Sequence, residues 1–371
     1  MKLTLDRAAL LKPLAALNRI VEKRTTIPIL SNILLKAADG RLTLQATDLD
    51  MEATAGVAAE VEMPGAITLP SATLHDIARK MPEGGRISME ANADGTHVVV
   101  KSGRSRFTVI ALPPGDFPDL SAGEPPHNFA MPAKTLARMI EQTRFAISTE
   151  ETRYYLNGIY LHVAAGEDGP WLTAVATDGH RLARVRAAVP EGAAGMPGVI
   201  VPRKTVGELV RMLDTTGDVA VSLSAAKIRF AIGVEVLTSK LIDGTYPDYL
   251  RVIPQGNDKR ATLDRAAMAQ ATDRVATVSS ERGRAVKFVF DKGQVSMSVT
   301  SPESGEAHEE MEADYDAAPL TIGFNAKYMA EILGTLDSDK VAVTMADAGS
   351  PTLIATPDDD SLLLVLMPMR V

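Results

Sequence analysis

The strongest constraint on the fold is an internal repeat: landmarks of the first third return in the same order in the second and third thirds. Each repeat has an apolar pair five residues apart and, later, a helical face of three apolar residues. Corresponding residues lie about 123 to 132 positions apart in a chain of 371. The pairs are Leu5 with Leu10, Met131 with Leu136 and Leu263 with Met268; the faces are Leu74, Ile77 and Met81, then Val206, Leu209 and Leu213, then Met329, Ile332 and Leu336. Three like domains with two helices each are therefore predicted.

Strand-like alternation, as in residues 41–47, separates the predicted helices and makes each domain α+β. The first helix is predicted over 6–24, with Asp6 as N-cap and Pro13 producing a kink or a later start. Linker-like composition at 121–127 places the first boundary, and the predicted domains are 1–125, 126–254 and 255–371. The alternative is a chance self-alignment of a mixed helix-and-strand protein. The shared order and spacing of four landmarks argue against it.

Composition excludes several classes of protein. A hydrophobic content of 46 % can build cores, and no apolar run reaches the length of about 18 residues that a membrane helix needs. Residues 1–10 carry charges where a signal peptide would be apolar, so a soluble, cytoplasmic protein is expected. With no cysteine, disulfides, zinc–thiolate sites and cysteine nucleophiles are excluded, and six histidines leave little for metal chemistry.

The distribution of charge points to a polyanion. The whole chain has a net charge of -8, which by itself argues against nucleic acid as a partner. The six predicted helices carry about +7, however, so the remainder carries about -15. Helix propensity favours Lys and Arg but favours Glu equally, so propensity alone predicts no surplus. We therefore expect a basic helical layer facing a polyanion. An aromatic content of 4 % offers few base-stacking platforms, and contact with phosphates without sequence preference remains.

The segment 177–182, Thr-Asp-Gly-His-Arg-Leu, contains His, Asp and Arg close together in the sequence. They could be an acid–base pair of a hydrolase, but no nucleophile-elbow serine accompanies them. A turn after the strand 172–176 is favoured. Residues 358–360, three aspartates, could resemble a metal cluster, although a solvated loop is favoured because consecutive carboxylates do not converge on one ion. No phosphate-loop or dinucleotide pattern occurs, and neither a cofactor nor a metal is expected.

The apolar run at 362–371 ends in Met367-Pro368-Met369. Residues 362–366 are typical of an edge strand that completes the third core. The two methionines beside a proline suit a surface that accepts varied apolar peptide side chains.

Ordered motifs run through the whole chain. They are Pro28-Ile29-Leu30, Ser102-Gly103-Arg104-Ser105-Arg106-Phe107, Arg153-Tyr154-Tyr155-Leu156-Asn157-Gly158, Ala176-Thr177-Asp178-Gly179-His180-Arg181-Leu182, Val201-Pro202-Arg203-Lys204, Tyr246-Pro247-Asp248-Tyr249, Ile322-Gly323-Phe324-Asn325 and the tail from Met367 to Val371. With these motifs the chain resembles the bacterial DNA polymerase III β subunit, the β sliding clamp. The resemblance implies three domains of the DNA-clamp fold, with helices lining an inner face and antiparallel sheets outside. Two chains would form a six-domain ring.

The resemblance also implies the function. A closed homodimer would encircle double-stranded DNA as a non-catalytic processivity factor for DNA replication. It would tether polymerase catalytic subunits, the clamp loader and repair proteins through short linear motifs, with no membrane partner. The implied groove residues are Leu156, Thr177, Gly179, His180, Arg181, Leu182, Pro247, Arg251, Val252, Val365, Leu366, Met367, Pro368, Met369 and Arg370. The implied DNA-binding residues are Arg24, Arg79, Tyr154, Tyr155, Arg203 and Lys204. The implied dimer interface joins Ile77, Met81, Phe107 and Val109 to Thr277 and Val278 of the other chain.

Three positions depart from the family pattern. Residues 71–73 lack the basic side chains expected before the second helix, and Glu150-Glu151 places acid beside the Tyr154-Tyr155 loop. Thr277 is more polar than the aliphatic residue expected at the joint. Two other classes remain as alternatives: a metabolic enzyme of repeated α+β domains, and a monomeric peptide-binding scaffold. Turnover of a small substrate would identify the first, and the mass in solution would identify the second.

Overall fold

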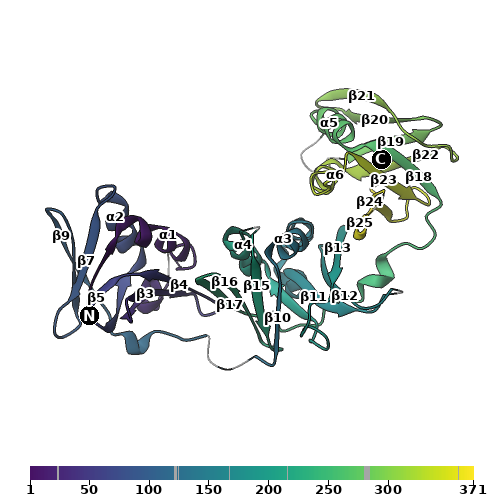
Figure 1. Cartoon of the computed structure of the whole chain (residues 1–371). Helices are drawn as coiled ribbons and strands as arrows, with labels where there is room; N and C mark the ends of the chain where they lie inside the picture. The colour runs from purple at the N-terminus through teal and green to yellow at the C-terminus, as the bar shows by residue number, and fades with distance from the viewer. Residues whose placement is uncertain are drawn as a thin grey trace. The chain divides into compact units, whose positions relative to one another are not determined.

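The computed structural model describes residues 1–22, 25–120, 123, 125–166, 168–214, 216–279, 285–357 and 359–371. The chain forms two compact units, which are described one at a time. Residues 1–133 and 211–241 make the first unit, and residues 134–210 and 242–371 make the second. The middle third of the chain therefore contributes strands to both units (Figure 1).

The first unit contains two antiparallel sheets. The five-stranded sheet has the order β5 (Glu60–Met63), β1 (Lys2–Asp6), β7 (Arg86–Ala91), β8 (His97–Ser102) and β9 (Ser105–Ile110). The eight-stranded sheet has the order β10 (His127–Pro132), β15 (Asp218–Leu223), β16 (Lys227–Ile232), β17 (Glu235–Lys240), β4 (Met51–Ala58), β3 (Arg41–Thr47), β2 (Asn32–Ala38) and β6 (Gly65–Pro70). Pairing of β17 with β4 joins strands from two repeats into one sheet.

The second unit repeats this plan. Its eight-stranded sheet has the order β14 (Val199–Pro202), β11 (Gly158–Ala164), β12 (Trp171–Thr177), β13 (Arg181–Ala188), β25 (Asp359–Leu366), β24 (Thr352–Thr356), β23 (Lys340–Met345) and β18 (Lys259–Asp264). Its four-stranded sheet has the order β21 (Gly305–Glu312), β20 (Gln294–Ser301), β19 (Ala285–Asp291) and β22 (Leu320–Asn325). Here β13 and β25 join two repeats.

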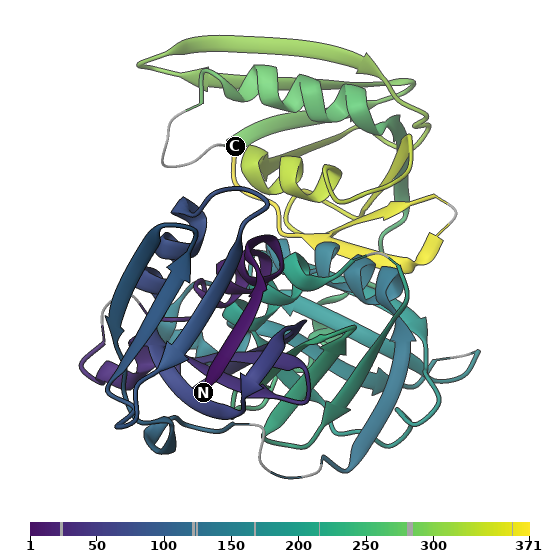
Figure 2. The ribbon, with the colours of Figure 1, turned by 60° about the vertical axis from the view of Figure 1, so that its left-hand side comes forward.

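Six α-helices occur in the described part of the chain, and each begins where a strand ends. They are α1 (Arg7–Leu17), α2 (Ser71–Lys80), α3 (Ala133–Glu141), α4 (Arg203–Met212), α5 (Arg265–Ala276) and α6 (Ala326–Leu333). Helix α1 packs against α2, and α5 against α6, so the helices cover their sheets in pairs (Figure 2). The predicted α+β class with two helices per repeat is confirmed.

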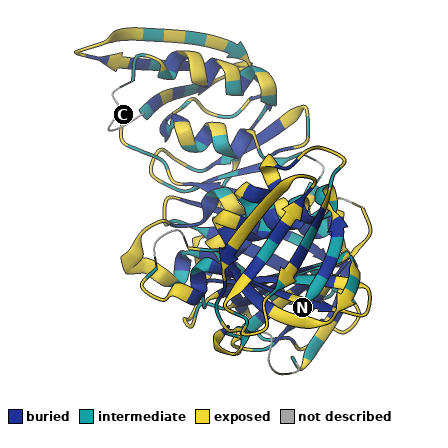
Figure 3. Ribbon diagram, turned by 90° about the vertical axis from the view of Figure 1, so that its left-hand side faces the viewer, coloured by how far each residue is buried: buried dark blue, intermediate teal, exposed yellow. Residues whose placement is uncertain are grey.

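Burial follows the predicted apolar faces. Leu74 and Ile77 of α2, Val206 and Leu209 of α4, and Met329 and Ile332 of α6 are all buried against the sheets. Burial alternates along the strands, because successive side chains point to opposite faces of a sheet. In β8, Val98 and Val100 are fully buried, and the residues between and beside them are more exposed. In contrast, β21 has a burial pattern with no buried position, and Figure 3 shows that strand largely in the colours of exposed and intermediate residues.

One expectation for the first helix was wrong, because it ends at Leu17 rather than at residue 24. Asp6 occupies the N-cap position as expected, although its side chain makes no capping hydrogen bond. Pro13 lies inside the helix and is buried there. At the C-terminal end of α1, the Ser71 hydroxyl of α2 donates to Oδ1 of the C-cap residue Asn18 at 2.6 Å and links the two helices.

Candidate functional site

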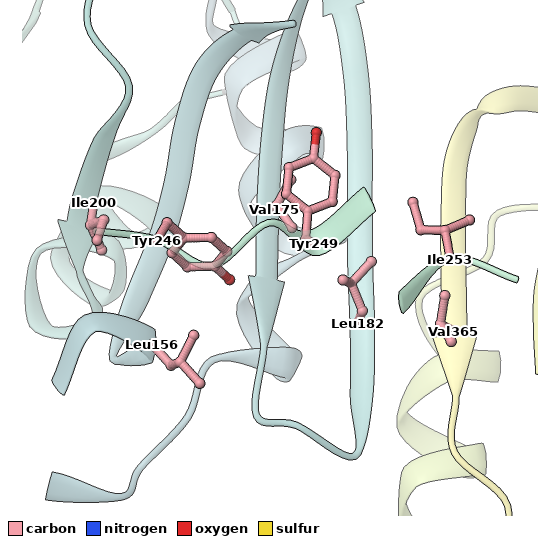
Figure 4. Close-up of a cluster of buried hydrophobic side chains, with 8 residues drawn as sticks. All are labelled: Leu156, Val175, Leu182, Ile200, Tyr246, Tyr249, Ile253 and Val365. Atoms are coloured by element: carbon pink, nitrogen blue, oxygen red, sulfur yellow. The ribbon is translucent and has the colours of Figure 1, made fainter. Parts of the chain in front are cut away.

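A buried apolar cluster in the second unit lies where β12, β13 and β25 meet the segment between β17 and β18. It consists of Leu156, Val175, Leu182, Ile200, Tyr246, Tyr249, Ile253 and Val365 (Figure 4). Leu182 and Val365 face each other across β13 and β25, so residues far apart in sequence share one wall. Of the expected groove residues, Leu156, Leu182 and Val365 belong to this cluster. We refer to the eight residues as the groove cluster.

A ladder of aromatic rings fixes the segment that carries Tyr246 and Tyr249. Tyr246 stacks on Tyr160 of β11 at 4.8 Å, and Tyr160 stacks on His162 at 4.4 Å. His162 Nε2 lies 3.1 Å from the Tyr249 hydroxyl and completes the ladder. Burial lowers the pKa of His162 and raises the pKa of Tyr246. The wall of the groove cluster is therefore held by stacked, uncharged rings.

Other expected groove residues form an exposed rim. Met367 is 38 % exposed and Val252 is 49 % exposed, both unusual for large apolar side chains outside an interface. Arg251 is exposed and pairs with Asp248 at 2.9 Å. Gly179, His180, Pro247 and Arg370 are also exposed, Thr177, Pro368 and Met369 are half-buried, and Leu366 is fully buried.

Residues 177–182 make a tight turn between β12 and β13. Asp178 Oδ1 accepts the backbone N–H groups of His180 at 2.9 Å and Arg181 at 3.1 Å. Gly179 has φ +89°, a conformation that favours glycine. The Thr177 hydroxyl donates to the Arg181 carbonyl at 2.7 Å. The Asp178 carboxylate is thus occupied by the turn, and the favoured interpretation of this motif is confirmed.

Arg181 has a role that differs from the one expected for a groove residue. Its guanidinium is 8 % exposed and donates to Asp178 Oδ2 at 3.1 Å, to the Phe145 carbonyl at 2.6 Å and to Glu331 of α6. It also lies over the Tyr328 ring at 4.3 Å. These bonds use three of its five N–H donors, so Arg181 positions α6 beside β13.

The tail after β25 is tied down at two points. The Met367 N–H donates to the His180 carbonyl at 2.8 Å, and the Met369 N–H donates to the Gly323 carbonyl of β22 at 2.8 Å. A Cβ atom at Gly323 would collide with Met369 and Val371, so glycine permits this close approach. The strand ends before the proline as expected. It is not the expected edge strand, however, because β25 lies inside its sheet between β13 and β24 and joins two repeats.

The expected DNA-binding residues are mostly exposed. Arg203 and Lys204 lie in the first turn of α4, Tyr154 is 53 % exposed, and Tyr155 is half-buried. Arg79 is exposed near the end of α2 and pairs with Asp76 at 3.1 Å. Arg24 lies outside the described residues. Glu150, which was expected to weaken this loop, pairs with Arg153 at 3.2 Å, so its charge is partly balanced.

The expected interface residues divide into two groups. Phe107 of β9 is 40 % exposed, Thr277 is exposed and Val278 is half-buried. Ile77, Met81 and Val109 are buried within the chain.

Comparison with known proteins identifies the chain. The N-terminal, central and C-terminal domain models of the DNA polymerase III beta subunit match residues 1–121, 130–248 and 250–370. The chain belongs to the DNA polymerase III beta subunit family. It is 49 % identical to the beta sliding clamp of Caulobacter vibrioides and 40 % identical to that of Escherichia coli K12, each over the full length of both chains. The structure of the Bartonella birtlesii clamp bound to griselimycin matches with a TM-score of 0.96, 47 % identity and full coverage of both chains.

Family membership decides between the alternatives. The chain is a sliding clamp, a non-catalytic processivity subunit whose partners are DNA and polymerase, and the metabolic-enzyme and scaffold alternatives are not supported. Across the described residues, no three His, Asp or Glu side chains gather to hold a metal ion. No helix in the described ranges is long and apolar enough to cross a membrane.

Sequence reasoning missed several members of the groove cluster. Val175, Ile200 and Ile253 carry no motif that marks them, because their grouping depends on strand pairing over long sequence distances. The signal that could have found Tyr246 and Tyr249 was the motif Tyr246-Pro247-Asp248-Tyr249, which contains both residues.

Proposed function

We propose that two copies of this chain close head-to-tail into a ring around duplex DNA and that the groove cluster with its rim holds short peptides of polymerases. The observation that carries the proposal is an exposed, apolar edge strand, β9, together with an acidic edge strand, β21. Because one chain carries both edge strands, each copy can contact its partner through β9 and through β21 at the same time.

Strand β9 lies at the edge of its sheet, where monomeric proteins normally have features that prevent pairing with another strand. It pairs with β8 on one side, and no described strand pairs with it on the other. Phe107 is 40 % and Ile110 is 67 % exposed there. A flat edge with free backbone donors and large apolar side chains invites another strand. Since both side chains are already partly buried, covering the remainder at a joint would stabilise an assembly by about 0.5 to 2 kcal/mol each.

Strand β21 complements β9 in charge. Its sequence, Gly-Glu-Ala-His-Glu-Glu-Met-Glu, has four carboxylates, and β20 is its neighbour in the sheet. Strand β9 is flanked by Arg104 and contains Arg106. A basic edge of one copy against an acidic edge of the other is a heterologous contact, and two such contacts related by a two-fold axis close a ring. The exposed Thr277 and the half-buried Val278, just beyond α5, would join the same contact.

DNA contact is proposed at the level of phosphates. Arg203 and Lys204 place cations at the start of α4, and Arg79 places another near the end of α2. Tyr154 and Tyr155 add hydroxyls on an exposed loop. Such contacts hold a duplex without reading its sequence, and they weaken steeply with salt. Arg24 stays part of this proposal on the basis of the family resemblance alone.

The peptide site rests on the exposed Met367 and Val252 above the buried wall of Leu182 and Val365. Apolar rim residues over a preformed wall suit an aliphatic or aromatic anchor of a linear motif. We extend the proposal to motifs of the clamp loader and repair proteins, to a cytoplasmic location, and to domain boundaries after residues 125 and 254. The family matches at 1–121, 130–248 and 250–370 support those boundaries.

Light scattering after gel filtration tests the ring most simply. One chain has a mass of 39.5 kDa, and the proposal expects twice that mass at micromolar concentration. A single-chain mass at every concentration up to tens of micromolar would contradict ring formation. A labelled peptide from the polymerase tail, measured by fluorescence anisotropy on the same sample, tests the groove separately.

A further inference from the structure

Beyond the groove cluster, two arginines continue the same face of β13. Leu182, Arg184 and Arg186 alternate along the strand and therefore point to one side of the sheet. Arg184 lies opposite Val175 of β12 and Leu363 of β25, and Val175 belongs to the groove cluster. A peptide that leaves the groove along this face would next meet Arg184.

Arg184 is a half-buried cation without a direct ion pair in the described part of the chain. It forms neither a hydrogen bond nor an ion pair with any residue in the described ranges, and its Nε is buried without a partner. Burial lowers the pKa of Arg184, and the positive charge of Arg186 lowers it further. Desolvated, unpaired charge is costly to a fold, and a nearby like charge adds to that cost. An anion placed beside Arg184 would offset the free-energy cost of its burial and of its repulsion by Arg186.

The neighbouring groups do not supply that anion. Arg186 donates to the backbone carbonyl of Asp360 at 2.8 Å and lies over the Trp171 ring at 5.4 Å. Asp168 and Asp360 line a cavity of about 400 Å³ with Arg186. The charge of Asp360 acts on Arg184 and raises its pKa, but less than burial lowers it, and neither carboxylate forms an ion pair with Arg184. The Tyr249 hydroxyl, the other acidic group that faces Arg184, has a pKa raised by burial and is therefore neutral.

We propose that Arg184, backed by Arg186, is an anion-binding site that receives a side-chain carboxylate of a partner peptide next to the apolar anchor held in the groove. This inference rests on the proposed peptide-binding function and adds a charge preference to it. A guanidinium fork that binds a carboxylate in a desolvated setting forms charge-assisted hydrogen bonds, which are stronger than neutral ones. Partners with Asp or Glu flanking their anchor would then bind more tightly than partners without them.

The test uses one peptide in five forms. A labelled peptide from the polymerase tail is prepared unextended, and with Glu-Glu-Glu or Gln-Gln-Gln added at either end. Anisotropy titrations are run on the wild-type protein, on Arg184→Gln and on the control Arg229→Gln. Arg229 is an exposed cation on β16 in the other unit, so both variants lose one positive charge.

For the wild type and the control, one Glu extension should tighten binding about tenfold over its Gln counterpart, and high salt should reduce this gain. In Arg184→Gln the gain should fall below about twofold, with the Gln-extended peptide unaffected. Equal binding of both Glu and Gln forms to the wild type, or a gain that survives in Arg184→Gln, would overturn the anion site. If the unextended peptide does not bind the wild type at all, the groove itself fails. The wild-type comparison needs no variant to fold.

Discussion

The Arg181 guanidinium of β13 is bound to the Glu331 carboxylate of α6, which joins the central family domain to the C-terminal one inside the second unit. The same guanidinium reaches Asp178 and lies between the rings of Phe145 and Tyr328. A turn that resembles a catalytic motif in sequence is thus a structural link between β13 and α6.

Arg181→Met should lower the free energy of unfolding by about 3 kcal/mol, because it leaves Asp178 without a cation in a desolvated site and leaves Glu331 with Lys327 alone. Urea unfolding followed by circular dichroism measures the loss. Arg229→Met, at an exposed position, should change stability by less than about 0.5 kcal/mol. A loss equally small for Arg181→Met would show that the link contributes little.

Phe107→Asp should weaken the proposed joint by placing a charge on the exposed apolar position of β9. We expect the mass by light scattering to fall toward 39.5 kDa at low micromolar concentration, with unfolding of the first unit unchanged. Val234→Asp alters an apolar residue that is 60 % exposed and lies away from β9 in sequence and sheet order. It should leave the mass unchanged; dissociation by both variants, or by neither, would argue against this joint.

Deleting residues 367–371 should abolish detectable peptide binding. The groove would lose the exposed Met367, and micromolar affinity corresponds to only about -8 kcal/mol. The deletion also removes two hydrogen bonds, from Met367 to His180 and from Met369 to Gly323, so a stability loss of about 2 kcal/mol is expected with it. Anisotropy and light scattering on one sample separate the effects. Undiminished peptide binding by a dimeric deletion variant would place the groove elsewhere.

The aromatic ladder predicts a pH effect on stability. Burial lowers the pKa of His162 below its unfolded value near 6.5, so the unfolded state binds the proton more readily, and stability falls as pH drops below about 6.5. The loss should stay under about 1 kcal/mol, since the ring is partly exposed and solvent screens it. His162→Phe keeps the stacking and should flatten this pH dependence, whereas His97→Gln, at an exposed position, should not. Parallel pH profiles for the wild type and His162→Phe would exclude His162 as the cause.

The sequence predicted the repeat, the six helices and the buried helical faces, because apolar periodicity is a local property that survives in each third. It did not predict where α1 ends, since packing of Asn18 against Ser71 decides that end. The apolar spacing of Ile77 and Met81 predicts a buried helical face, and both residues are buried, whereas the family resemblance placed them at the dimer joint. The sequence also did not predict the hydrogen-bond partners of Arg181 or the lack of an ion pair at Arg184. The surroundings of both side chains come from strands and helices that are distant in the chain.

Replacing Arg203 and Lys204 with Glu should reduce residence on DNA at low salt without changing the mass in solution. Each lost phosphate contact should also reduce the slope of log affinity against log salt by about 1. Binding to a nicked circular plasmid, measured by co-elution at several salt concentrations, gives both quantities. Arg41→Glu with Arg229→Glu reverses two exposed cations elsewhere and serves as the control. Equal residence of the two double variants would remove α4 from the DNA face.

Retention on circular DNA tests the central claim most directly. The protein is loaded onto nicked plasmid with the loader, free protein is removed, and half of the sample is cut once with a restriction enzyme before gel filtration. A closed ring that holds DNA by topology should remain on the circle and leave the linear product through its ends, even at a salt concentration that weakens phosphate contacts. Equal retention on circular and linear DNA with free ends would contradict encirclement.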